Sequence, residues 1–215
     1  MLLPRLDPDR AVAAAGGPPP TELLIDTRRY QWAIGIFGLV LVIAFSIYLF
    51  ATNGISSVGI PAGKSLYRFV APLATGDVNR DVNTHPRCHP DAPNPQALNV
   101  CGRTPLVLDF FVTGSGDCKR QVDTLQTVSR QFPGIRFAAV AVDAGRAETA
   151  ALVRSHHWTI PIAYDRDDAL GRIYGVEICP MVELAARGGQ VTDRLIGDKW
   201  QHPADLAARV RRLAG

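Results

Sequence analysis

Four cysteines carry the most distinctive chemistry in this chain of 215 residues. They are Cys88, Cys101, Cys118 and Cys179. Cysteine sulfurs can bind metals, form structural disulfides or exchange disulfides with other proteins. An even number permits two disulfides, with three possible connectivities, in a protein exposed to an oxidising compartment. The role of each sulfur therefore depends on the location of the chain and on the elements that position it.

Cys88 and Cys101 lie in an irregular segment, residues 81–104, that is rich in Pro and Asn. A disulfide between them would close a loop of about 14 residues and add about 3 kcal/mol to stability in the chain-entropy model. We therefore predict a structural disulfide here. The alternative is a zinc site that also uses His85 and His89, because thiolate and imidazole suit this metal. The spacing matches no zinc motif, and we expect neither a metal nor a cofactor.

An uncharged apolar stretch, residues 32–51, is long enough to cross a bilayer as a helix. Arg28 and Arg29 precede it, and the next basic residue after it is Lys64. This asymmetry predicts a single-pass protein of the cell membrane with a cytoplasmic N-terminus and an extracytoplasmic C-terminal domain. A cleaved signal peptide is the alternative, but the charged leader is long for one and no small-residue cleavage site follows.

The composition predicts four segments. We expect a disordered cytoplasmic tail at 1–29, a transmembrane helix at 30–51, an extracytoplasmic linker with the Cys88–Cys101 segment at 52–104, and a folded domain at 105–215. The net charge of +3 is too small to indicate nucleic acid, so we expect no such partner.

From Pro105 onward, apolar runs alternate with amphipathic segments. Strands are predicted at 106–112, 135–142, 161–165, 181–186 and 190–197, and helices at 117–132, 146–157, 168–174 and 203–213. The order β-α-β-α-β-α-β-β-α predicts an α/β domain with a mixed central sheet and helices on both faces.

Two sequence motifs link these elements to a known family. Residues 109–118 read DFFVTGSGDC, and residues 174–180 read YGVEICP. Residues 105–213 thereby resemble the thioredoxin superfamily, and most of all the membrane-anchored TlpA/ResA-like thiol–disulfide proteins. In that family the corresponding motifs are D-F-W-A-x-W-C-x-x-C and Y-G-V-x-x-x-P. The resemblance implies the thioredoxin fold, with Pro180 as a cis-proline that faces the active-site turn.

The active-site motif departs from the family pattern. The attacking cysteine of the family falls on Ser115, and a serine hydroxyl cannot form a disulfide. Ordinary C-x-x-C chemistry is therefore absent. The remaining Cys118 is expected in the first turn of a helix, where amide groups favour a thiolate, whereas the neighbouring Asp117 disfavours it.

The resemblance also implies partners for Cys118. Asp109 falls where many thioredoxins keep a buried carboxyl group, whose raised pKa would let it shuttle a proton. Cys179 precedes Pro180, and this position lies against the active-site cysteines of the fold, close enough for a disulfide with Cys118. The candidate catalytic residues are thus Cys118, Cys179, Asp109, Ser115 and Pro180. The alternative is that both cysteines and Asp109 are structural.

These residues are compatible with three functions. The favoured one is thiol–disulfide exchange or redox maintenance in the cell envelope through Cys118 and Cys179. Its partners would be protein thiols or disulfides, with the lipid bilayer contacted through residues 32–51. The second is a non-catalytic binding module that uses the groove around Ser115 and Pro180. The third is a peroxiredoxin-like peroxidase, whose P-x-x-x-T-x-x-C motif would place its proline at Phe111.

Overall fold

A computed structural model of the chain describes residues 27–52, 58–88 and 94–214. Contacts between residues divide the chain into two compact units, residues 1–52 and 53–215. Most of the predicted cytoplasmic tail lies outside the described residues, and only its residues 27–29 are described, as the start of the first helix.

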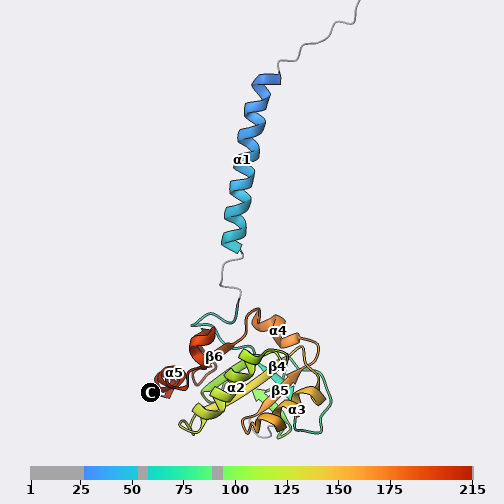
Figure 1. Cartoon of the computed structure of the whole chain (residues 1–215), viewed down its shortest axis with the longest axis vertical. Helices are drawn as coiled ribbons and strands as arrows, with labels where there is room; N and C mark the ends of the chain where they lie inside the picture. Colours follow the sequence, from blue (N-terminus) through green and yellow to red (C-terminus); the bar gives the residue numbers. More distant parts are fainter. Residues whose placement is uncertain (1–26, 53–57, 89–93, 215) are drawn as a thin grey trace, which may run out of the picture. The chain divides into compact units, whose positions relative to one another are not determined.

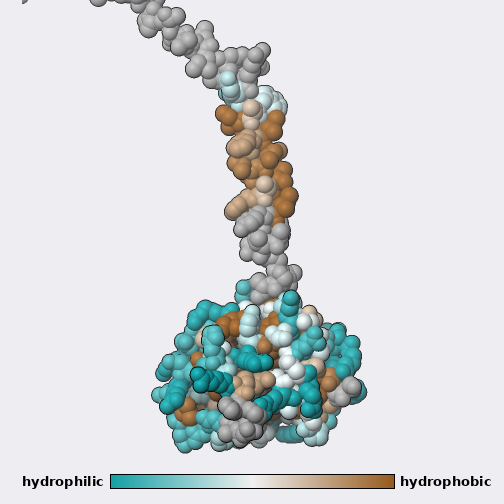
Figure 2. Space-filling model, turned by 180° about the vertical axis from the view of Figure 1, so that it is seen from behind, coloured by the Kyte–Doolittle hydropathy of each residue, from teal (hydrophilic) through white to brown (hydrophobic). Residues whose placement is uncertain are grey.

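The first unit contributes one long helix, α1 (Thr27–Thr52). Its segment from Tyr30 to Ile47 is apolar enough to cross a membrane, and none of it is buried by other parts of the protein. Figure 2 shows this apolar surface along the described part of the helix. A helix that is apolar all round usually lies in a protein core or in a bilayer.

The second unit is built on a five-stranded sheet with the order β5-β4-β3-β6-β7 (Figure 1). The strands are β3 (Leu106–Phe111), β4 (Arg136–Val142), β5 (Ile162–Asp165), β6 (Met181–Ala185) and β7 (Val191–Ile196). Strands β3, β4 and β5 are parallel, whereas β6 and β7 form an antiparallel extension. The central strand β3 is entirely buried, which explains its nearly continuous apolar sequence.

The helices are α2 (Gly116–Ser129), α3 (Arg146–His156), α4 (Ala169–Tyr174) and α5 (Pro203–Ala214), with a short 3-10 helix η3 (Asp198–Gln201) before α5. The predicted order of elements and the mixed sheet are confirmed. Helix α2 ends at Ser129, before the predicted Phe132, because the chain turns ahead of Pro133.

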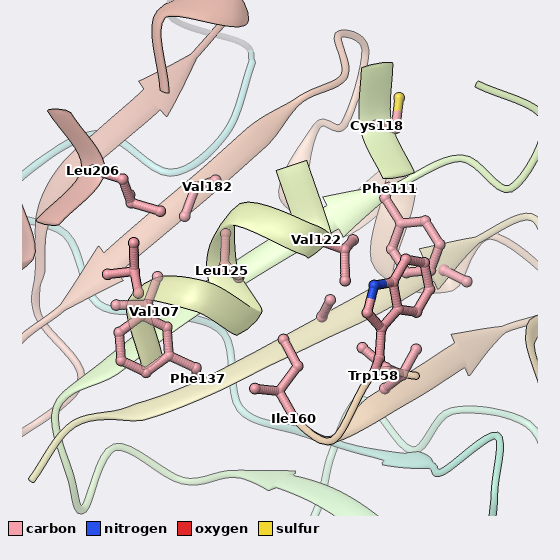
Figure 3. Close-up of a cluster of buried hydrophobic side chains, with 14 of the residues drawn as sticks. Val107, Phe111, Cys118, Val122, Leu125, Phe137, Trp158, Ile160, Val182 and Leu206 are labelled. Atoms are coloured by element: carbon pink, nitrogen blue, oxygen red, sulfur yellow. The ribbon is translucent and has the colours of Figure 1, made fainter. Parts of the chain in front are cut away.

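One face of the sheet packs against α2, α3 and α5. Figure 3 shows this cluster, in which Val122 and Leu125 of α2 and Leu206 of α5 cover the sheet residues Val107 and Val182. All five side chains are almost completely buried. This packing fixes the start of α2 above the carboxyl end of β3.

The other face is covered partly by residues that precede Pro105. Strands β1 (Phe69–Pro72) and β2 (Ala97–Val100) form an antiparallel pair, and Phe69 and Leu98 are fully buried in the same cluster as Phe110. The structure thus differs from the expectation of a linker and an irregular segment at 52–104, because this range contains two strands and its residues from 53 onward belong to the same compact unit as the sheet. The six-residue helix α4 is too short to cover this sheet face alone, and β1 and β2 are too short to stand out in the sequence.

Residues just after α1 are fixed to the sheet by a buried carboxyl group. Glu183 on β6 is fully buried and accepts a hydrogen bond of 2.6 Å from the backbone N–H of Ile60. Arg194 donates to the carbonyl oxygens of Val58 and Gly59. Gly59 has a φ of +72°, and a Cβ there would lie 2.4 Å from the Arg194 side chain, so this close approach requires glycine. Residues 58–60 are therefore part of the domain.

Candidate active site

The turn between β3 and α2 positions the first sulfur. Ser115 is the N-cap of α2, with extended backbone, and its hydroxyl oxygen accepts a 3.4 Å hydrogen bond from the N–H of Cys118. Cys118 therefore occupies the first turn of a 14-residue helix, where free amide groups favour negative charge. In the same turn Asp117 forms an exposed ion pair with Arg120, which partly offsets the negative charge of this carboxylate.

A disulfide joins Cys118 to Cys179 across 61 positions of sequence, with their Cα atoms 5.6 Å apart. Cys179 belongs to the segment that leads into β6, and the peptide bond between Cys179 and Pro180 is cis. The two residues differ in exposure, because Cys118 is 1% exposed whereas Cys179 is partly exposed. The structure thus brings together Cys118, Cys179, Pro180 and Ser115, which sequence reasoning placed in one site.

Asp109 lies in the middle of β3, between Ala139 of β4 and Val182 of β6. Because side chains alternate along a strand, Asp109 shares the α2-covered face of the sheet with Val107 and Phe111. It is fully buried, and neither carboxylate oxygen has a hydrogen-bond partner of normal geometry in the described part of the chain. Burial raises its pKa well above the ordinary value, so the protonated form is favoured.

Gln121 is a second buried polar residue, on the same helix as Cys118, and sequence reasoning missed it. It lies three positions after Cys118, and therefore on the same side of α2. The side chain is fully buried, and its amide nitrogen and oxygen have no partner among the described residues. A signal was present, because a glutamine adjoins Val122 in the apolar stripe of this helix. Buried polar groups without partners are rare in proteins, and here two of them, Asp109 and Gln121, lie on the packed pair β3 and α2.

The second disulfide lies elsewhere in the domain. It joins Cys88 to Cys101, 13 positions apart, with a Cα–Cα distance of 5.8 Å. Because both sulfurs are bonded to each other, neither is available as a thiolate ligand for a metal. His89, which the zinc alternative requires, lies outside the described residues. Within the described ranges there is also no cluster of three His, Cys, Asp or Glu that could hold a metal.

Structural comparison identifies similar folds, although no family model matches the sequence and no curated protein is significantly similar to it. A thiol:disulfide interchange protein DsbE from Chlorobium tepidum is 18% identical, with a TM-score of 0.56 over 72% of this chain and 96% of its own. The thioredoxin domain of a thiol-disulfide oxidoreductase from Bacteroides vulgatus is 14% identical, with a TM-score of 0.55 over 73% and 99% of the two chains.

A third similar structure is a secreted disulfide oxidoreductase of Mycobacterium tuberculosis, described as homologous to DsbE of E. coli. It is 17% identical, with a TM-score of 0.52 over 67% of this chain and 95% of its own. At sequence identities this low, the structural similarity shows a shared fold. Together with the β3–α2 turn and the sheet order, it identifies this chain as a protein with the thioredoxin-like fold.

Proposed function

We propose that this protein is a membrane-anchored, extracytoplasmic thioredoxin-like protein that exchanges disulfides with protein thiols in the cell envelope. The observation that carries the proposal is the disulfide between Cys118 and Cys179. It combines a partly exposed sulfur with a sulfur at a helix N-terminus. Such an arrangement provides both access for an incoming thiol and a stabilised leaving thiolate.

Asp109 would manage the proton in this reaction. Opening the disulfide releases a thiolate that must be protonated before the reduced state is stable. Asp109 is buried on the sheet face that α2 covers, and its pKa is raised by burial. A buried carboxylic acid with a raised pKa can donate its proton and later recover it. We propose that Gln121 helps to keep this buried region polar enough for the transfer.

The location in the envelope is supported by two independent features. Helix α1 is long and apolar enough to cross a membrane, and Arg28 and Arg29 precede its apolar part, which favours a cytoplasmic N-terminus. In that orientation the domain lies outside the cytoplasm, where disulfides persist. Two disulfides in one small domain suit such a compartment.

The proposal is tested by oxidation of a reduced substrate protein. Full-length protein in lipid nanodiscs would be mixed with reduced ribonuclease A, and the formation of substrate disulfides would be followed by alkylation and mass spectrometry. The variant Cys118→Ser/Cys179→Ser should lose the activity. The matched control Cys88→Ser/Cys101→Ser, which also removes one disulfide, should retain it. Equal activity of the wild type and the Cys118→Ser/Cys179→Ser variant would refute disulfide exchange and favour a non-catalytic binding module.

A further inference from the structure

The two sulfurs of the Cys118–Cys179 disulfide differ in how an attacking thiol can reach them. Cys118 is 1% exposed and belongs to the buried cluster that contains Phe111 and Val122. Figure 3 shows its side chain on the first turn of α2, at the edge of this cluster. Cys179 is partly exposed and adjoins Ile178, which is 47% exposed. A thiolate from another protein therefore meets Cys179 first.

The two sulfurs also differ in how well their surroundings accept a negative charge. Cys118 lies at the N-terminus of α2, where backbone N–H groups stabilise a thiolate. The sulfur of Cys179 lies 3.7 Å from the carbonyl oxygen of Phe110, and the negative end of this dipole disfavours a thiolate there. Because the more stable thiolate is the better leaving group, Cys118 is the sulfur that leaves.

We propose that Cys179 is the sulfur attacked by the substrate and that Cys118 is the leaving sulfur. This inference rests on the proposed function. It reverses the arrangement that the family motif implies, in which the substrate is bound at the turn before the helix, at the position of Ser115. Here the loop before Pro180 would carry the covalently bound substrate.

The proposed steps balance in atoms and electrons. A substrate thiolate attacks Cys179, the bond between Cys179 and Cys118 breaks, and the Cys118 thiolate takes a proton from Asp109. A second substrate thiolate then attacks the substrate sulfur of the mixed disulfide and releases Cys179, which takes a proton from solvent. The substrate loses two electrons as its two thiols become a disulfide, and the protein gains them as two thiols. Asp109 recovers its proton from solvent.

The site of the mixed disulfide can be mapped directly in the wild-type protein. Oxidised full-length protein would be exposed to reduced glutathione, quenched with acid, treated with N-ethylmaleimide and digested for mass spectrometry. We expect glutathione on Cys179 and maleimide on Cys118, with the disulfide between Cys88 and Cys101 intact as an internal control. Glutathione on Cys118, or equal amounts on both, would overturn the inference while leaving the proposed exchange function standing.

Single variants provide a second measurement. In Cys118→Ser the free thiol is Cys179, and in Cys179→Ser it is Cys118. Cys179 should react with oxidised glutathione at least about tenfold faster, because Cys118 is almost completely buried and access limits its rate even though its position favours the thiolate. Equal rates, or a faster Cys118, would contradict the assignment. A disulfide that never opens with glutathione in the wild type would instead refute both the assignment and the exchange function.

Discussion

The two disulfides of this domain have nearly the same span, with Cα–Cα distances of 5.6 and 5.8 Å, but very different surroundings. Cys101 directly follows β2, and its disulfide with Cys88 closes a loop that contains this strand. Cys118 and Cys179 join the start of α2 to the loop before β6. Strand β3 and helix α2 also carry Asp109 and Gln121, whose buried polar atoms have no partner among the described residues. Because the two spans are nearly the same, the proposed difference in reactivity must come from the residues that surround each disulfide.

Removal of the disulfide between Cys88 and Cys101 should give the largest effect on stability. We expect Cys88→Ser/Cys101→Ser to lower the free energy of unfolding by about 3 kcal/mol, because the unfolded chain regains the entropy of an open loop. Disulfide exchange at Cys118 and Cys179 should persist. Urea denaturation followed by circular dichroism measures the first quantity. If Cys88→Ser/Cys101→Ser kept its stability but lost exchange, the structural role assigned to this disulfide would be wrong.

A comparable effect on the free energy of unfolding is expected from Glu183, a buried carboxyl group on the opposite sheet face from Asp109. Burial raises its pKa from 4.5 to about 7. Its protonated form therefore favours the folded state, and this contribution is complete below pH 4.5 and lost as the pH rises to 7. The wild type should lose roughly 3 kcal/mol of stability over this range relative to Glu183→Gln.

This prediction is checked by urea denaturation of both proteins at a series of pH values. The exposed Glu148 offers a control, since Glu148→Gln should leave the slope with pH unchanged. A wild type and a Glu183→Gln variant with parallel profiles would contradict the role assigned to this carboxyl group.

The third effect tests whether Asp109 belongs to the reactive disulfide. Asp109→Asn should slow exchange by about 100-fold at neutral pH, because it removes the proton donor for Cys118. Its stability relative to the wild type should rise with pH, since burial raises the pKa of Asp109 and an ionised carboxylate there is unfavourable. The rate of thiol release at several pH values measures the first effect. Glu183→Gln, which removes a buried carboxyl group from the other face, should exchange at the wild-type rate.

The smallest effect concerns the residue that replaces the usual nucleophile. Ser115 caps α2, so Ser115→Ala should lower stability by about 1 kcal/mol. It should slow exchange by no more than about fivefold, the rate equivalent of that free energy. Ser155→Ala, near the end of α3, serves as the control for loss of a hydroxyl group. A complete loss of exchange in Ser115→Ala would indicate that the hydroxyl takes part in the chemistry.

The sequence predicted the elements from Pro105 onward because their signals are local. The buried strands are continuous apolar runs, and Pro133 and Pro203 mark helix ends. The candidate site could not be predicted from local signals alone, because the disulfide between Cys118 and Cys179 joins segments 61 positions apart. This pairing was predicted from the family resemblance. Composition alone does not indicate which distant cysteines lie close together.

Three features could not be predicted because they depend on packing between distant segments. Strands β1 and β2 have only four residues each, and their place is set by the sheet face that they cover. Glu183 lies in the apolar run MVELA and Gln121 adjoins Val122. The contacts that bury these two side chains form only when α2 lies on β3 and Ile60 lies on β6.

The complete pairing of the four cysteines has a consequence for the survival of the protein. Peroxide damages cysteine by converting a thiolate to sulfenic and then to irreversible sulfinic acid. In the oxidised chain no thiolate is present to begin this series, so the resting form should tolerate oxidative stress. Only the short-lived reduced form would expose sulfur to permanent damage, and a rapid return to the disulfide would protect it.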